Sequence, residues 1–432
     1  MPPSKKTPKK WIPDDAQLAD RWIAYHRQTA WGMGEWRRYK DGVWETTDKD
    51  IIKQEVTNIL EKAQSEGVRV TNGLISSTME IARTKVSIPN DKWDADPNYL
   101  PCKNGVYHIP SKKLLPHLPD IYATSQLEFD YDPAAACPAF MKALQRIPDV
   151  IDFLQEFVGY SLTTETKHEL AVWFYGVIGS GKSTIIEGIQ AMIGKKRHGI
   201  LGLAQIERSR FALANLPGKT LVTSFEQPEM FISVSHILNS IISGEQIPVE
   251  QKFKDEILIT PHCKILWAMN ELPRVSNPNN GIMRRVKVVK FPPLPEDEKD
   301  VDLKECIKTE GTGILNWALI GLERLNARGR FDPPQSVIDA TKEYQDKNDI
   351  PKLFLEEVGA LIDPLDPHCR TKAQDLYDAY SDWCKRTNHK PMSSTRLAEE
   401  WKRLGFERTT INGARYWVGV EYSPFTVASN VP

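Results

Sequence analysis

The segment Gly176-Val-Ile-Gly-Ser-Gly-Lys-Ser183 decides the fold that the sequence predicts. It follows the apolar run of residues 170–175 and opens residues 183–193, which have helical spacing, so a glycine-rich loop joins a buried strand to a helix. In such a loop, backbone amides and the helix N-terminus surround phosphate groups, and glycines permit their close approach. The pattern therefore predicts a site for a nucleoside triphosphate with magnesium.

Each position of this loop has an expected role. Lys182 is expected to contact the β- and γ-phosphates of ATP, and the Ser183 hydroxyl is expected to ligate Mg²⁺. A loop with a purely structural role is the alternative, and the flanking strand and helix argue against it. The remaining candidates for binding the nucleotide are Gly176, Gly179, Ser180, Gly181 and Thr184.

The chain around the loop alternates strand and helix patterns, which indicates an α/β fold with a parallel sheet. Buried strands are predicted at residues 219–225 and 264–269, and residues 231–242 form an amphipathic segment. Residues 247–259 alternate like a hairpin with a charged tip. Helical residues 314–325 follow, and residues 330–335 (RFDPPQ) are interpreted as a linker.

Polar residues at two strand ends are candidates for chemistry on a bound triphosphate. A carboxylate there holds Mg²⁺ or activates water, and Glu226 fits this role, with Glu229 as the alternative. Asn270 ends the strand at 264–269, where an amide can orient water against the γ-phosphate. A simple turn residue at the strand end is the alternative interpretation of Asn270.

Arg284 and Arg285 lie in a basic stretch that turns into a strand. Transition-state charge on a phosphoryl group is stabilised by an arginine, which ring ATPases typically take from a neighbouring subunit. One of these two arginines is the candidate, and an ordinary ion pair is the alternative.

Length and composition bound the rest of the chain. The 432 residues exceed the usual size of one domain, about 100–200 residues, so two to four domains are expected. No apolar run reaches the roughly 20 residues of a membrane helix, and the N-terminus is unlike a signal peptide, so a cytosolic protein without a membrane partner is expected. The net charge of −1 leaves any DNA contact to local patches.

The six cysteines include no CxxC pair, which indicates reduced thiols rather than a disulfide framework. His368, Cys369, Cys384 and His389 cluster loosely, but their spacing matches no zinc module. No metal other than Mg²⁺ is expected.

The order of these motifs resembles superfamily 3 helicases, specifically the phage and plasmid primase-helicase family related to the poxvirus-type primase. DADPNYLPCKNGVYHIPSKKLLPHLPDIYAT resembles that family's N-terminal helicase-associated domain, and SRFALANLPGKTLVTSFEQPE resembles the segment before its Walker B acid. LYDAYSDWCKR with the later GARYWVGVEY resembles its C-terminal winged-helix-like domain. The resemblance covers about residues 15–420.

The resemblance implies an AAA+-like P-loop ATPase core with a mixed α+β N-terminal helicase-associated domain and a C-terminal winged-helix-like domain. The expected divisions are a basic flexible tail at 1–12, the N-terminal domain at 13–140, the ATPase domain at 141–330, the C-terminal domain at 336–424 and a tail at 425–432.

The function implied by the resemblance is an ATP-dependent DNA helicase of a phage, plasmid or other mobile element, in the cytosol of a host cell. Its expected form is a homo-hexamer that translocates 3′ to 5′ on single-stranded or forked DNA. In this family's scheme, Glu226 is the Walker B acid that holds Mg²⁺ together with Ser183, Asn270 is the sensor, and Arg284 or Arg285 acts in trans.

Two regions are expected to contact DNA. At the hairpin tip, Lys252, Phe253 and Lys254 would face the pore, where ammonium groups track phosphates and an aromatic ring stacks on a base; a solvated tip is the alternative. In the last domain, residues 393–404 look like a recognition helix followed by a hairpin wing at 406–420, although a protein contact is equally open. The basic candidates there are Arg396, Lys402, Arg403, Arg408 and Arg415.

The sequence departs from the family pattern in two places. Ser243-Gly244-Glu245 stands where relatives commonly have Gly-Gly-Asp, and Asn239 stands where many have lysine. Too few residues precede the helicase-associated region for a primase-polymerase domain, so a separate primase or polymerase is the expected partner. A nucleotide-switched DNA-binding initiator that does not unwind DNA is the alternative function, and a small-molecule kinase is disfavoured.

Overall fold

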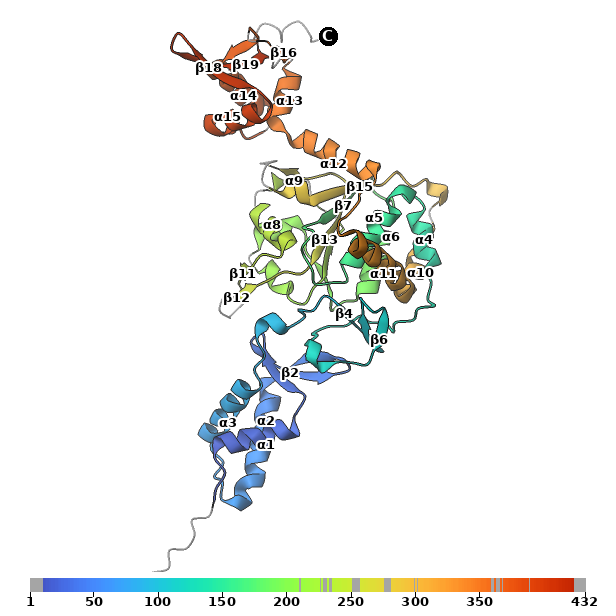
Figure 1. Cartoon of the computed structure of the whole chain (residues 1–432), viewed down its shortest axis with the longest axis vertical. Helices are drawn as coiled ribbons and strands as arrows, with labels where there is room; N and C mark the ends of the chain where they lie inside the picture. The colour runs from blue at the N-terminus through green and yellow to red at the C-terminus, as the bar shows by residue number, and fades with distance from the viewer. Residues whose placement is uncertain are drawn as a thin grey trace, which may run out of the picture.

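The computed structural model describes residues 11–209, 211–225, 227, 231–232, 235–250, 257–275, 281–298, 300, 302–358, 361–362, 366, 368–387 and 389–422. The chain is elongated, with N-terminal helices at one end, a sheet with helices in the middle, and a second helical region at the other end (Figure 1). No helix among these residues has the length and apolar character that a membrane span requires.

The middle of the chain is built on a five-stranded sheet in the order β15-β7-β13-β9-β8, and all neighbouring strands are parallel. The predicted parallel sheet is therefore confirmed. Because the strands are parallel, their carboxyl ends meet at one edge, where polar side chains from different strands come close together. The strands are β7 (Ala171–Tyr175), β8 (His198–Ile200), β9 (Leu221–Ser224), β13 (Lys264–Met269) and β15 (Val286–Lys290).

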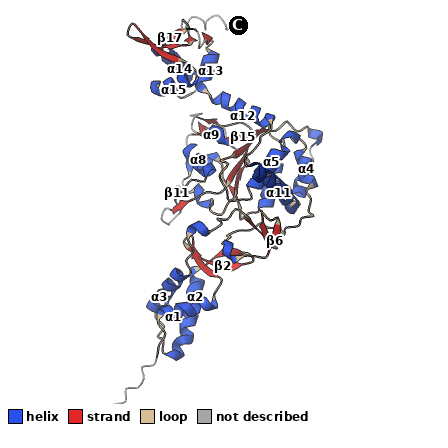
Figure 2. Ribbon diagram, viewed as in Figure 1, coloured by secondary structure: helices blue, strands red, loops and turns tan. Residues whose placement is uncertain are grey.

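Helices cover both faces of this sheet, and each face has its own hydrophobic core (Figure 2). Successive strand residues point to opposite faces, so Val172 and Phe174 belong to one core and Trp173 to the other. The first core includes α4 (Pro138–Leu144), α5 (Ile151–Tyr160), α6 (Lys182–Ile193), α10 (Leu303–Thr309) and α11 (Gly311–Arg328). The second includes α7 (Leu203–Arg208), α8 (Ser235–Ser243), α9 (Ile282–Arg285) and α12 (Gln335–Asn348).

Two short pairs of strands lie beside the main sheet. β11 (Ile247–Val249) pairs antiparallel with β12 (Ile257–Ile259), as the alternating pattern predicts, while the tip at 251–256 lies outside the described residues. β10 (Phe231–Ile232) pairs parallel with β14 (Arg274–Val275). The amphipathic segment at 231–242 thus divides into a short strand and α8.

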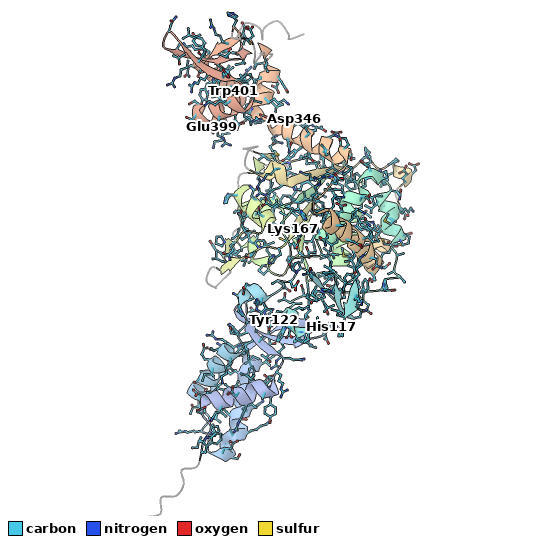
Figure 3. The ribbon with its side chains drawn as sticks, viewed as in Figure 1. His117, Tyr122, Lys167, Asp346, Glu399 and Trp401 are labelled. Atoms are coloured by element: carbon cyan, nitrogen blue, oxygen red, sulfur yellow. The ribbon has the colours of Figure 1, made fainter. Side chains whose placement is uncertain are left out.

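The N-terminal region combines three helices with two small antiparallel sheets. The turn at Asp41-Gly42 has positive φ at both residues (49° and 87°), which is the conformation of a tight hairpin turn. Tyr122 lies in the segment after β6 (Figure 3). Its ring stacks on Trp44 of β3 at a centroid distance of 6.1 Å, so this segment packs on the sheet of β1, β2 and β3. The elements are α1 (Asp15–Tyr25), β1 (Thr29–Gly32), β2 (Glu35–Lys40), β3 (Val43–Thr47), α2 (Lys49–Lys62), α3 (Asn72–Lys85), β4 (Tyr99–Cys102), β5 (Gly105–His108) and β6 (Lys113–Leu115).

The C-terminal region packs around the buried Trp401 (Figure 3). Its helices are α13 (Ile350–Glu357), α14 (Ala373–Arg386) and α15 (Ser394–Arg403), and the Ser393 side chain caps α15. Three antiparallel strands lie beside them in the order β17-β19-β18. These strands are β17 (Arg370–Lys372), β18 (Glu407–Ile411) and β19 (Ala414–Val418), and a separate antiparallel pair is formed by β16 (Leu361–Ile362) and β20 (Val420–Glu421).

Helix α12 connects the sheet to this last region. Ala340 and Tyr344 belong to the core of the parallel sheet, and the Tyr344 hydroxyl donates a hydrogen bond of 2.7 Å to the Pro273 carbonyl. The boundary expected between the ATPase domain and the C-terminal domain lies at residues 330–336. The helix that follows this boundary, α12, packs on the parallel sheet.

Candidate nucleotide-binding site

The glycine-rich loop at 176–181 leaves the end of β7 and enters α6. Gly179 and Gly181 have φ values of 78° and 90°, which residues other than glycine rarely adopt. A Cβ atom on Gly176 would lie 2.6 Å from the carbonyl oxygen of Phe291. The three glycines are thus required by the backbone path of the loop.

The side chain of Lys182 fills the inside of this loop. It is 6% exposed, and its Nζ donates hydrogen bonds to the carbonyl oxygens of Gly176 (2.6 Å) and Val177 (2.8 Å) and to Ser180 Oγ (3.1 Å). Burial lowers the pKa of Lys182, because removal from water disfavours the charged ammonium. An anionic group in the loop would offset this cost, so the residues fit a bound phosphate.

Asn270 lies beside this ammonium. The register of the sheet pairs Met269 with Tyr175, so the residue after β13 lies next to the start of the loop. Its side-chain oxygen accepts a hydrogen bond of 3.2 Å from Lys182 Nζ. The structure therefore brings together two of the residues that the sequence selected.

Arg146 is a neighbour of the loop that the sequence analysis missed. Its guanidinium donates hydrogen bonds to the carbonyl oxygens of Ser180 (3.5 Å) and Pro293 (2.8 Å). It adds a second positive charge at the mouth of the loop. Arg146 belongs to no motif, and its position follows only from the packing of α4 on α6.

The expected magnesium ligands are described only in part. Ser183 is exposed and Thr184 is half-buried in the first turn of α6, which follows Gly181 directly. Glu226 and Glu229 lie outside the described residues. The hydroxyl of Ser183 is the described group that would hold Mg²⁺ next to a phosphate in the loop.

Arg284 and Arg285 both contact Glu169. The Nη2 atoms of the two arginines lie 3.2 Å and 2.6 Å from Glu169 Oε2. Their exposure differs, since the side chain of Arg284 is 69% exposed and that of Arg285 is 10% exposed. Arg285 also donates a hydrogen bond to the Gly281 carbonyl, so the ion pair expected as the alternative role is present for both.

These arginines lie at the amino ends of the parallel strands, whereas the loop lies at their carboxyl ends. They precede Val286, which pairs with Ala171, the first residue of β7, whereas the loop follows the last residue, Tyr175. A strand of this length spans roughly 13 Å at about 3.3 Å per residue. Neither arginine therefore lies near Lys182 of the same chain.

The candidate DNA contacts have different environments. Lys252, Phe253 and Lys254 lie outside the described residues. Arg403 is held in two ion pairs, one with Glu400 of the same helix at 2.7 Å and one with Asp349 at 2.6 Å, and the second connects α15 to the start of α13.

The other basic side chains of the last region are more accessible. Lys402 and Arg415 are exposed, and Arg408 lies over the Trp417 ring at 5.6 Å. Arg396 is half-buried and lines a groove that faces the sheet.

The two departures from the family pattern lie near α8. Glu245 accepts a hydrogen bond of 2.8 Å from Ser240 Oγ, which connects this carboxylate to the preceding helix α8. A Cβ atom on Gly281 would lie 3.4 Å from Asn239 Nδ2, so Asn239 faces the segment that begins α9.

Two segments of the sequence match known protein families. Residues 18–148 match the family described as D5 N terminal like, and residues 174–285, which include the loop, match a family of unknown function, DUF5906. Together with the viral relatives described below, these matches support the resemblance to the primase-helicase family. The DUF5906 match covers the glycine loop, Asn270 and both arginines, so the candidate site lies within a region shared with other proteins of that family.

Curated relatives of this chain come from viruses. "Putative helicase 121R" of Invertebrate iridescent virus 3 is 23% identical over 68% of this chain and 36% of its own length. "Putative helicase L207/L206" of Acanthamoeba polyphaga mimivirus is 21% identical over 73% of this chain and 35% of its own length. The chain thus spans about a third of the length of these relatives.

A solved structure shares the fold of the chain. The apo structure of the NrS-1 C-terminal region superposes with a TM-score of 0.52, covering 95% of this chain and 100% of that one at 12% sequence identity. At this identity, the likeness extends to the fold alone.

Proposed function

We propose that this chain is an ATP-driven DNA helicase, in which six identical chains form a ring that moves 3′ to 5′ along single-stranded DNA. The observation that carries the proposal is the contact of Lys182 with Asn270 at the carboxyl edge of the parallel sheet. It combines an ammonium suited to bind phosphate with an amide that can orient water, which are two of the parts used in hydrolysis of a γ-phosphate. The helicase names of the viral relatives agree with this proposal.

The proposal assigns a role to each part of the chain. Residues 141–330 act as an AAA+-like ATPase domain, 13–140 as the helicase-associated domain, and 336–424 as a winged-helix-like domain, with tails at 1–12 and 425–432. The loop amides and Lys182 bind the phosphates of ATP. When bound, Mg²⁺ neutralises phosphate charge, and Ser183 and Glu226 are the residues that would hold it.

A ring explains the position of the two arginines. Neither lies near the loop of its own chain, so either of these two could reach a transferring phosphoryl group only at the loop of a neighbouring protomer. Arg284 is the better candidate, because its guanidinium is 69% exposed while Arg285 is 10% exposed and bound to Gly281 and Glu169.

The DNA contacts and partners complete the proposal. Lys252, Phe253 and Lys254 at the hairpin tip face the pore and contact successive nucleotides. Primers for replication come from a separate primase or polymerase.

The test compares ATP turnover with and without single-stranded DNA and adds strand separation on a forked substrate. We expect DNA to raise turnover and Lys182→Ala to abolish both turnover and unwinding. Lys195→Ala, an exposed lysine just beyond the same helix, is the matched control and should retain both activities. DNA binding without strand separation would instead support the nucleotide-switched initiator, and turnover that ignores DNA would exclude the helicase.

A further inference from the structure

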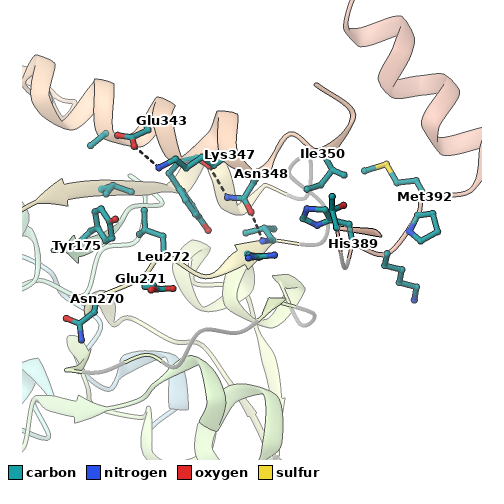
Figure 4. A pocket seen from close by; sticks show the side chains of 18 of the residues that line it. Tyr175, Asn270, Glu271, Leu272, Glu343, Lys347, Asn348, Ile350, His389 and Met392 are labelled. Atoms are coloured by element: carbon teal, nitrogen blue, oxygen red, sulfur yellow. Dashed lines mark hydrogen bonds and ion pairs between the residues drawn. The ribbon is translucent and has the colours of Figure 1, made fainter. Parts of the chain in front are cut away.

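A groove of about 1240 Å³ lies between the carboxyl edge of the sheet, α12 and the segment that leads into α15 (Figure 4). Small-molecule pockets usually measure about 300–1,000 Å³, so this groove is large enough for a segment of a polymer. The sequence analysis did not select it, because its lining residues come from separate segments between Tyr175 and Arg396.

The groove is basic, although the chain as a whole is not. The full sequence balances 56 lysines and arginines against 57 acidic residues. The groove, in contrast, is lined by five lysines and arginines and one histidine against Glu271 and Glu343. Its basic residues are Arg274, Lys290, Lys347, His389, Lys390 and Arg396.

Contacts within the groove leave its positive charge in excess. Glu343 lies 2.8 Å from Lys347 and 3.7 Å from Lys290, so its charge is already offset. Across the groove, the pKa of His389 is lowered by burial and also by the positive charge of Arg274. His389 therefore favours its neutral form, and the positive charge of this wall comes from Lys390 and Arg396, which line the groove opposite Arg274.

The groove also has apolar and amide surfaces. Leu272 lies on the sheet side, and Ile350 and Met392 lie on the side of the C-terminal region (Figure 4). At its other end are Tyr175 and Asn270 (Figure 4). Since Asn270 accepts a hydrogen bond from Lys182, this end of the groove lies beside the glycine-rich loop.

We propose that this groove binds the backbone of single-stranded nucleic acid, with Lys390 and Arg396 contacting phosphates from the wall of the C-terminal region. The choice of ligand rests on the proposed function. Excess cations match a phosphodiester backbone, and the flat faces of bases cover apolar side chains such as Leu272 and Met392, which an acidic peptide would leave exposed. The ligand then contacts Asn270, next to the nucleotide.

The test measures binding of a fluorescent single-stranded oligonucleotide of mixed sequence to the full chain at several salt concentrations. Each phosphate contact contributes about −0.7 to the slope of log affinity against log salt for single strands. We expect Lys390→Ala/Arg396→Ala to weaken binding roughly tenfold and to reduce the slope by about 1.4. Turnover of ATP without DNA should stay unchanged, which shows that the variant is folded.

The matched control is Lys402→Ala/Arg415→Ala, which removes two exposed cations of the same region outside the groove. Loss of affinity in this control with none in the groove variant would overturn the proposal and place DNA on the helix and hairpin of the C-terminal region. An unchanged affinity in both would likewise overturn it and assign the groove to an acidic protein partner. Wild-type protein that binds no oligonucleotide at all would instead count against the helicase itself.

Discussion

The side-chain oxygen of Asn270 accepts a hydrogen bond of 3.2 Å from the ammonium of Lys182, 88 residues earlier in the chain. The register of β13 on β7 makes this contact, because it places Asn270 beside the first residue of the loop. An arriving γ-phosphate has to share the ammonium with this amide. The contact therefore connects the group proposed to bind phosphate to the group proposed to orient water.

We expect Asn270→Ala to lower the turnover number for ATP by about 10²-fold, in the range found when one polar group is removed from a transition-state site. Nucleotide affinity should change little, because the loop amides and Lys182 remain. Steady-state kinetics and binding of a fluorescent ATP analogue measure the two effects separately. Asn58→Ala, at an exposed position of α2, is the control, and a turnover equal to that of the control would refute the role.

The two arginines should respond differently to the same substitution. Arg284→Ala removes an exposed group, so we expect ATP turnover to fall by about 10³-fold with an unchanged melting temperature. Arg285→Ala removes a buried group with a hydrogen bond to Gly281 and an ion pair with Glu169, so we expect a loss of about 1–3 kcal/mol in stability. The readouts are turnover and thermal unfolding of each variant.

Mixed rings distinguish action in trans from action within one chain. If Arg284 serves the neighbouring protomer, an Arg284→Ala chain added to a Lys182→Ala chain should restore part of the turnover. Restoration requires that one mutant chain supply the arginine and the other the loop. The absence of any restoration, with rings still forming, would argue against action in trans.

The sequence was sufficient for the elements that depend on local pattern. The strand at 264–269 agrees with β13 at both ends, and the glycine loop lies between a strand and a helix as expected. Parallel pairing also followed, because alternating strands and helices allow few other arrangements. These features depend on residues close together in the chain.

Contacts between residues far apart in the chain could not be predicted from the sequence. Glu169 contacts Arg284 across 115 residues, and Arg146 contacts Ser180 across 34. Apolar spacing shows that α12 has a buried face, but not that Ala340 packs on the parallel sheet. The groove also was not predicted, because exposed lysines on separate elements have no sequence pattern in common.

Glu156 should be a strong determinant of stability. It is 2% exposed and lies on α5, where Arg324 Nε of α11 contacts it at 2.7 Å and Arg328 makes a second ion pair. Removing one member of a buried ionic group leaves the other charges unpaired, so we expect Glu156→Ala to cost about 3–5 kcal/mol. Denaturant unfolding measures the loss, with the exposed Glu323→Ala on α11 as the control. Equal midpoints for the two variants would contradict this role.

Lys264 should give the stability of the chain a characteristic pH dependence. Its ammonium is fully buried at the start of β13, where Nζ donates hydrogen bonds to the carbonyl oxygens of Thr163 (2.6 Å) and His262 (3.0 Å). Burial lowers the pKa of Lys264 from 10.5 to about 7. Between these two values the unfolded chain binds a proton that the folded chain does not, so folding becomes more favourable as the pH rises.

The variant Lys264→Met removes this titration while keeping most of the apolar side chain. We expect the free energy of unfolding of the wild type, measured relative to the variant, to increase between pH 7 and pH 10 by on the order of a few kcal/mol. Urea unfolding at several pH values measures both proteins under the same conditions. Parallel profiles would show that Lys264 titrates alike in the folded and unfolded chains, and its burial would then carry no electrostatic cost.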